Sequence, residues 1–227
     1  MSKLLILFLI PVASASILTE ETAMKAVKNI IWNTVQPQNE TCNAEISNMN
    51  IIWNTVQPQN ETCNAEISNM VECFSGIQNY KAIFENYDVL RNQTYMTELI
   101  SKLEDSSDCV GEPTCSSTLL LKYLVDGAVF VGENVYGDSF ECFFNKGNFP
   151  DKLEECTDDE PETLDDLRAI AKCTARILDC NEDDQERFVK AAYAAIDMLQ
   201  NVLDIENFSD NVENMHFNAT YYEGIHW

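Results

Sequence analysis

Residues 161–203 read PETLDDLRAIAKCTARILDCNEDDQERFVKAAYAAIDMLQNVL, and this stretch decides the fold. On both sides of Cys180, apolar side chains recur at steps of three and four residues, which is the spacing of an amphipathic α-helix. We therefore predict two helices that meet at Cys180. Pro161 is expected as the first helical residue of one helix, and Asn181 as the N-cap of the other. The inner faces of the two helices are formed by Leu164, Leu167, Ile170, Thr174, Ile177, Leu178, Phe188, Ala192, Ala195, Ile196, Leu199 and Leu203.

Cys173 and Cys180 are seven residues apart, which is close to two full turns of a helix. The two side chains consequently project from the same helical face and are poorly placed to bond each other. We expect each of them to join this helical layer to an element packed on it.

The N-terminal segment, residues 1–15, has the features of a secretory signal peptide. Lys3 precedes an apolar run from Leu4 to Val12, and Ala13-Ser14-Ala15 forms a small-x-small cleavage site. The apolar run is far shorter than the roughly 20 residues of a membrane span, and no later stretch supplies one. We expect a secreted, extracellular protein whose mature chain begins at Ser16.

The mature chain is strongly acidic. Without Lys3 it has 13 basic and 38 acidic residues, which gives a net charge of −25. This charge repels nucleic acid and anionic membranes, so we predict neither as a partner. Solubility is the simplest role for the charge, and a cationic partner or loosely bound calcium is the alternative.

One block of the sequence occurs twice without a substitution. Residues 29–49 read NIIWNTVQPQNETCNAEISNM, and residues 50–70 repeat them. A solenoid needs about three units to bury a continuous core. Two identical copies therefore indicate a recent in-frame duplication or a gene-model error rather than an architecture.

The duplication explains why an exported chain has an odd number of cysteines, nine. Cysteines in the secretory pathway form disulfides, and Cys42 and Cys63 are copies of each other. A single helical stripe leads from Cys63 to Cys73, whereas Pro58 separates Cys42 from Cys73. We therefore expect Cys42 to be spare, either free or in an intermolecular bridge. About 105 pairings remain possible for the other eight, which are Cys63, Cys73, Cys109, Cys115, Cys142, Cys156, Cys173 and Cys180.

Helical spacing also organises the rest of the chain, because no segment alternates with a period of two and only 7 residues are glycine. We predict an all-α, disulfide-braced, irregular bundle of about six to eight helices. A helix that is apolar on nearly all sides, residues 119–131, is expected at its centre. A short helix over 96–103 is expected before a loop over 105–114. The predicted organisation is a signal peptide over 1–15, an N-terminal helix and the duplicated block over 16–59, a cysteine-rich helical domain over 60–204, and a mobile acidic and aromatic tail over 205–227.

The sequence contains no arrangement that identifies a catalytic, cofactor-binding or metal-binding site. His216 and His226 lie in the expected tail, which leaves a histidine-dependent mechanism without an anchored base. Residues 179–183 alternate like the start of a calcium loop, but Asp184 and Lys190 occupy the positions that require Gly and Glu. We therefore predict helix-capping acids there, no metal, no cofactor and no enzyme.

Asparagine glycosylation is the one modification that the sequence predicts. A signal-bearing chain with Asn-x-Ser/Thr sequons is expected to use some of them, on the surface. The candidate sites are Asn39, Asn60, Asn92, Asn207 and Asn218.

The cysteine order gives the chain a family resemblance over residues 60–195. It combines Cys63 and Cys73, the pair Cys109 and Cys115, the segment DSFEC that ends at Cys142, Cys156, and the segment CTARILDC before a helix with Phe188. In this order the chain resembles the nematode secreted family catalogued as domain of unknown function 19. The resemblance implies an eight-cysteine helical domain behind a signal peptide, and it implies no activity. The duplicated block and the acidic C-terminal extension depart from that family.

These features favour a non-catalytic extracellular protein that presents a surface to an extracellular protein or a host molecule. The alternative is a carrier of a lipid or a small apolar ligand, which would use residues 119–131 and the aromatic cluster Phe140, Phe143 and Phe144. A hydrolase with paired carboxylates is the third possibility.

Overall fold

The computed structural model describes residues 61–75, 77, 89, 91–146, 149–157, 161, 163–203 and 216–226. In this part of the chain the regular elements are all helical, and four disulfides brace them. The prediction of an all-α, disulfide-braced bundle is therefore confirmed. The signal peptide, the first copy of the block, the expected N-terminal helix and Cys42 lie outside the described residues. The elements are α4 (Glu61–Cys73), α5 (Gln93–Val110), α6 (Ser116–Tyr136), the π-helical turn η4 (Glu141–Lys146), α7 (Phe149–Glu155), α8 (Leu164–Ile177), α9 (Glu182–Leu203) and α10 (Ala219–Glu223).

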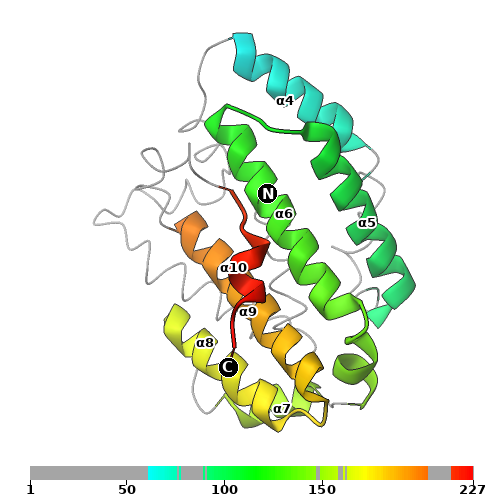
Figure 1. Ribbon diagram of the computed structural model, residues 1–227, viewed down its shortest axis with the longest axis vertical. Coiled ribbons are helices and arrows are strands. Elements are labelled where there is room, and N and C mark those ends of the chain that lie inside the picture. Colours follow the sequence, from blue (N-terminus) through cyan, green and yellow to red (C-terminus); the bar gives the residue numbers. More distant parts are fainter. Residues whose placement is uncertain are drawn as a thin grey trace, which may run out of the picture.

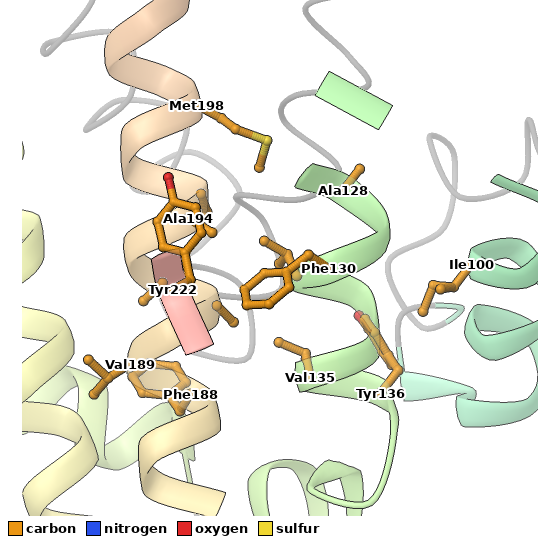
Figure 2. Close-up of a cluster of buried hydrophobic side chains, with 14 of the residues drawn as sticks. Ile100, Ala128, Phe130, Val135, Tyr136, Phe188, Val189, Ala194, Met198 and Tyr222 are labelled. Atoms are coloured by element: carbon orange, nitrogen blue, oxygen red, sulfur yellow. The ribbon is translucent and has the colours of Figure 1, made fainter. Parts of the chain in front are cut away.

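Helix α6 forms the centre of the bundle, as its all-round apolar sequence predicts. It packs against α5 on one side and against α9 on the other, while α8 covers α9 and α4 lies at the edge beside α5 (Figure 1). Val125 and Val131 of α6 and Val189 of α9 are at most 1% exposed. Figure 2 shows this core, with Phe130, Val135 and Tyr136 of α6 facing side chains of the neighbouring helices.

Two glycines allow the close approach of α6 to its neighbours. A Cβ atom on Gly132 would lie 2.6 Å from Cγ1 of Ile100 in α5. A Cβ atom on Gly127 would lie 2.2 Å from Sδ of Met198 in α9. The glycines are five residues apart, about 140° around the helix, so each serves a different interface.

Gly132→Ala is expected to destabilise the protein, although alanine favours helices by about 1 kcal/mol over glycine. Ile100 is branched at Cβ and cannot easily move away, and overpacking of this kind costs about 1–3 kcal/mol. Urea unfolding should show a net loss of up to about 2 kcal/mol. The neighbouring substitution Glu133→Ala, on the exposed side of α6, is the control and should change little. A Gly132→Ala protein as stable as the unchanged chain would show that the α5–α6 contact adapts freely.

The prediction of a loop over residues 105–114 is wrong for its first half, because α5 continues to Val110. Ser106 and Ser107 are buried, and Oγ of Ser106 donates a hydrogen bond to the carbonyl of Cys73 at 3.0 Å. Serine and aspartate suggest a loop in the sequence, but here tertiary partners satisfy the serines within a helix. The helix ends at Gly111, whose φ of 67° suits glycine at such a position.

Pro161 is not the first helical residue, which corrects a second prediction. Helix α8 begins after Thr163, whose Oγ1 accepts a hydrogen bond from the amide of Asp166 at 3.1 Å. The Asp166 carboxylate in turn accepts from the amide of Thr163 at 2.8 Å. This reciprocal capping box places the N-cap two residues beyond the proline, and the helix starts at Leu164. In α9 the predicted cap is confirmed, since the amide of Asp184 donates to Oδ1 of Asn181 at 2.8 Å.

The prediction of a mobile tail over 205–227 is also wrong for residues 216–226. We call these residues the C-terminal strap. The strap contains α10 and lies over α9 (Figure 1). Tyr222 is only 6% exposed, and the ring of Phe217 lies 5.5 Å from that of Phe130. Two aromatic residues in a polar stretch have no helical periodicity, so the sequence did not reveal that they dock on the bundle.

Candidate functional site

The eight expected cysteines form four pairs, with Cα–Cα distances between 5.6 and 5.8 Å. Cys173 and Cys180 do not bond each other, as expected, but the premise that they share one helical face is wrong, because α8 ends at Ile177 and Cys180 lies beyond it. They bond Cys156 and Cys142, which join α8 and its C-terminal end to the segment that contains η4 and α7. The other two pairs are Cys63–Cys115 and Cys73–Cys109.

These last two pairs hold α4 at both of its ends. Cys63 bonds the residue just before α6, and Cys73 bonds the last turn of α5. Among the described side chains of α4, only Cys63 and Met70 are buried, whereas Val71 is 61% exposed. So little apolar burial does not hold a helix of 13 residues by itself. Disulfides therefore provide much of what keeps α4 at the edge of the bundle.

A carboxylate of α4 provides a further attachment, because Glu66 caps the N-terminus of α6. Its oxygens accept hydrogen bonds from the amides of Thr114 and Cys115 at 3.0 Å and from Oγ1 of Thr118 at 2.7 Å. The side chain of Cys115, the N-cap residue, makes no capping bond of its own. Burial raises the pKa of Glu66, but the hydrogen bonds from Thr114, Thr118 and Cys115 outweigh burial and lower the pKa below its ordinary value. Sequence reasoning missed Glu66, and a helix that begins without a capping side chain was the available signal.

Glu66→Gln is expected to reduce stability at neutral pH and to weaken its dependence on acid. The folded-state pKa of Glu66 lies below the unfolded value of 4.5, so its contribution is present above pH 4.5 and is lost as the pH falls through the folded-state value. Glutamine keeps one acceptor oxygen and no charge, which should cost about 1–3 kcal/mol at pH 7. Urea unfolding at pH 7 and pH 3 measures both effects. Glu72→Gln, at an exposed position of the same helix, is the control, and parallel pH profiles of all three proteins would refute the role of Glu66.

A polar cluster between α5 and α6 contains serine, lysine and aspartate. Nζ of Lys122 lies 2.7 Å from Oγ of Ser107 and 3.3 Å from Oδ1 of Asp126, which also accepts a hydrogen bond from Ser107. A serine beside a lysine can act as a nucleophile when the amine accepts the hydroxyl proton. Here the ammonium is paired with a carboxylate and is a donor only, while Ser107 is 5% exposed. The cluster therefore serves as a partly buried polar bridge between two helices.

The aromatic residues expected to line a ligand pocket are packed against other aromatic rings. Phe140 and Phe144 are stacked with ring centroids 4.7 Å apart, and Phe144 lies 5.6 Å from Tyr136. Phe143 meets the edge of Phe188 at 5.7 Å. Burial raises the pKa of Tyr136, whose hydroxyl has no hydrogen-bond partner among the described residues. These rings of η4 therefore pack against one another and against rings of α6 and α9.

The C-terminal strap is fixed by stacked rings and by one charged partner. Phe217 stacks on Tyr222 at 5.3 Å, and the Tyr222 hydroxyl donates to Oδ2 of Asp197 in α9 at 3.0 Å. Oδ1 of Asp197 lies 2.7 Å from the Arg168 guanidinium of α8, so one carboxylate links the strap to two helices. Burial, and then the negative charge of Asp197, raise the pKa of Tyr222 and keep its hydroxyl protonated as a donor.

Two of the predicted glycosylation sites lie in the described residues. Asn92 and Asn218 are exposed N-cap residues of α5 and α10, and their Oδ1 atoms accept backbone hydrogen bonds at 3.1 and 3.2 Å. The Nδ2 atom, which would carry the glycan, is not needed for the cap. Asn39, Asn60 and Asn207 lie outside the described residues, and use of any of the five sites stays a prediction.

No family model, curated protein or solved structure matches the chain. Within the described residues, no group of three or more His, Cys, Asp or Glu side chains is arranged to hold a metal ion. His216 and His226 are both exposed. None of the helices in that part of the chain is long and apolar enough to cross a membrane.

Proposed function

We propose that this is a secreted, non-catalytic protein whose disulfide-braced bundle presents the outer face of α4 to a basic extracellular protein. The observation that carries the proposal is the attachment of α4. Two of the four disulfides and the Glu66 cap hold a helix whose buried side chains, among those that the structure describes, are Cys63 and Met70. A rigidly held and solvent-facing helix loses little conformational entropy when it binds a partner.

The exposed face of α4 gives the proposed contact its chemistry. Asn64, Ser68 and Val71 follow at helical spacing, so amide and hydroxyl groups flank one exposed apolar side chain. The net charge of −25 expected for the mature chain would attract a basic partner and speed its association, and added salt should weaken this attraction.

The carrier alternative has less support. The predicted pocket aromatics contact one another and the core rings Tyr136 and Phe188. The resemblance to domain of unknown function 19 agrees with secretion, implies no activity, and remains part of this proposal.

Site-specific photocrosslinking tests the proposal on protein recovered from a secretory host. A crosslinking residue at Ser68 should form a covalent adduct in the extracellular fluid, and unlabelled protein should compete for it. The control is the same residue at Glu154, an exposed position of α7. Val71→Arg should abolish the adduct, because it places a bulky cation against a basic partner. Equal adducts from Ser68 and Glu154, or insensitivity to Val71→Arg, would refute the α4 face as the binding surface.

A further inference from the structure

Three residues at the N-terminus of α6 bind side chains of α4. We call these residues, Thr114, Cys115 and Thr118, the receiving site. Cys115 forms the disulfide, while all three residues donate hydrogen bonds to the carboxylate of Glu66. Cys63 and Glu66, which occupy this site, both belong to the duplicated block. So does Met70, which is 4% exposed.

An identical set of side chains lies one block earlier in the chain. Residues 29–49 repeat residues 50–70 without a substitution, so a segment docked at the receiving site in the same way would present the same atoms. The counterparts of Cys63, Glu66 and Met70 are Cys42, Glu45 and Met49.

We propose that the receiving site binds either copy of the block, and that the Cys42 thiol exchanges one copy for the other. The Cys42 thiolate attacks Sγ of Cys115, the Cys63–Cys115 bond breaks, and Cys63 leaves as a thiolate. One thiol and one disulfide are present before and after this step, so it needs neither an oxidant nor a reductant.

The residues that follow each copy determine which copy predominates at the receiving site. The second copy continues into Cys73, which is bonded to Cys109 and accepts a hydrogen bond from Ser106. Docking of the first copy would leave residues 50–72 as a loop between two anchored points. Closing a loop of about 23 residues disfavours this form on the order of 100-fold. The second copy is therefore the principal occupant, and the first is a minor one.

Cys63→Ser removes the principal occupant and tests the exchange. The protein is alkylated without reduction and then cleaved at methionine, which places Cys42 in fragment 25–49, Cys63 in fragment 50–70 and Cys115 in fragment 97–198. We expect fragment 25–49 to be disulfide-linked to fragment 97–198 in Cys63→Ser, and fragment 50–70 to be linked in Cys42→Ser. An alkylated Cys115 in Cys63→Ser would overturn the proposal.

Substitution of the two glutamates shows whether the docking contact moves with the disulfide. Glu45→Gln should leave the melting temperature of the unchanged chain unaffected and lower that of Cys63→Ser. Glu66→Gln should lower the melting temperature of the unchanged chain and leave that of Cys63→Ser unaffected. If Cys63→Ser fails to fold, the exchange is tested on the unchanged protein instead. After incubation at pH 8, about 1 molecule in 100 should carry the 25–49 linkage, and fewer than about 1 in 10,000 would refute an exchange governed by this loop closure.

Discussion

Reduction of the four disulfides is expected to unfold the protein at room temperature. Each disulfide of such a domain contributes about 2–4 kcal/mol, whereas the total stability of a domain is about 5–15 kcal/mol. Three of the bonds close long loops, with sequence separations of 52, 36 and 38 between the joined positions, and the fourth spans 17. Circular dichroism during heating, with and without a strong reductant, should show loss of the cooperative transition.

Intact mass after alkylation is the necessary control, because it shows whether all eight paired cysteines have been reduced. Paired serine substitutions then rank the bonds. In the chain-entropy account, removing Cys63–Cys115 should cost only slightly more than removing Cys156–Cys173. Cys73–Cys109 lies within the first loop and shortens it, and Cys156–Cys173 itself lies within the loop of Cys142–Cys180. A fully reduced protein with an unchanged melting temperature would mean that helix packing alone maintains the fold.

The double substitution Phe217→Ala and Tyr222→Ala is expected to lower the free energy of unfolding by about 3–6 kcal/mol. Phe217 lies against Gly127 and Phe130 of α6, and Tyr222 is buried with its hydroxyl on Asp197. Truncation removes both apolar contacts and leaves the aromatic surface of α6 exposed. The change should appear in urea unfolding and in increased binding of a dye specific for apolar surface.

Tyr221→Ala provides the matched control for this prediction. Tyr221 is the neighbour of Tyr222 in α10 and meets the edge of its ring at 5.0 Å, but it is 62% exposed. Its substitution should change stability by no more than about 0.5 kcal/mol. If the double variant were as stable as Tyr221→Ala, the strap would not contribute to the fold.

Features that depend on short-range spacing could be predicted from the sequence. The three- and four-residue steps in residues 161–203 indicated α8 and α9, and the apolar run of residues 119–131 indicated the central helix. The absence of a bond between Cys173 and Cys180 was also expected, but its premise of one shared helical face was wrong, because α8 ends at Ile177 and Cys180 lies beyond the helix. The cap of α9 by Asn181 was predictable because the capping contact spans three residues.

Features that depend on distant partners were decided only by the tertiary structure. The sequence allowed about 105 cysteine pairings, and helix packing selected one of them. Glu66 lies 48 residues from Thr114, and no local pattern links a carboxylate in one helix to the open N-terminus of another. The last turns of α5 are helical because Ser106 finds a partner on α4, although the local sequence favours a loop.

The C-terminal strap shows the same division. Phe217 and Tyr222 are too few to form an amphipathic stripe, so the sequence alone indicated a mobile acidic and aromatic tail. They are ordered because α6 and α9 together supply a surface of rings, a glycine and a carboxylate. The sequence by itself determined the helical class and the cysteine set, because both follow from spacing and composition. The structure decided which cysteines pair, what caps α6 and where the C-terminal strap docks. Each of these depends on surfaces that exist only after the helices have packed.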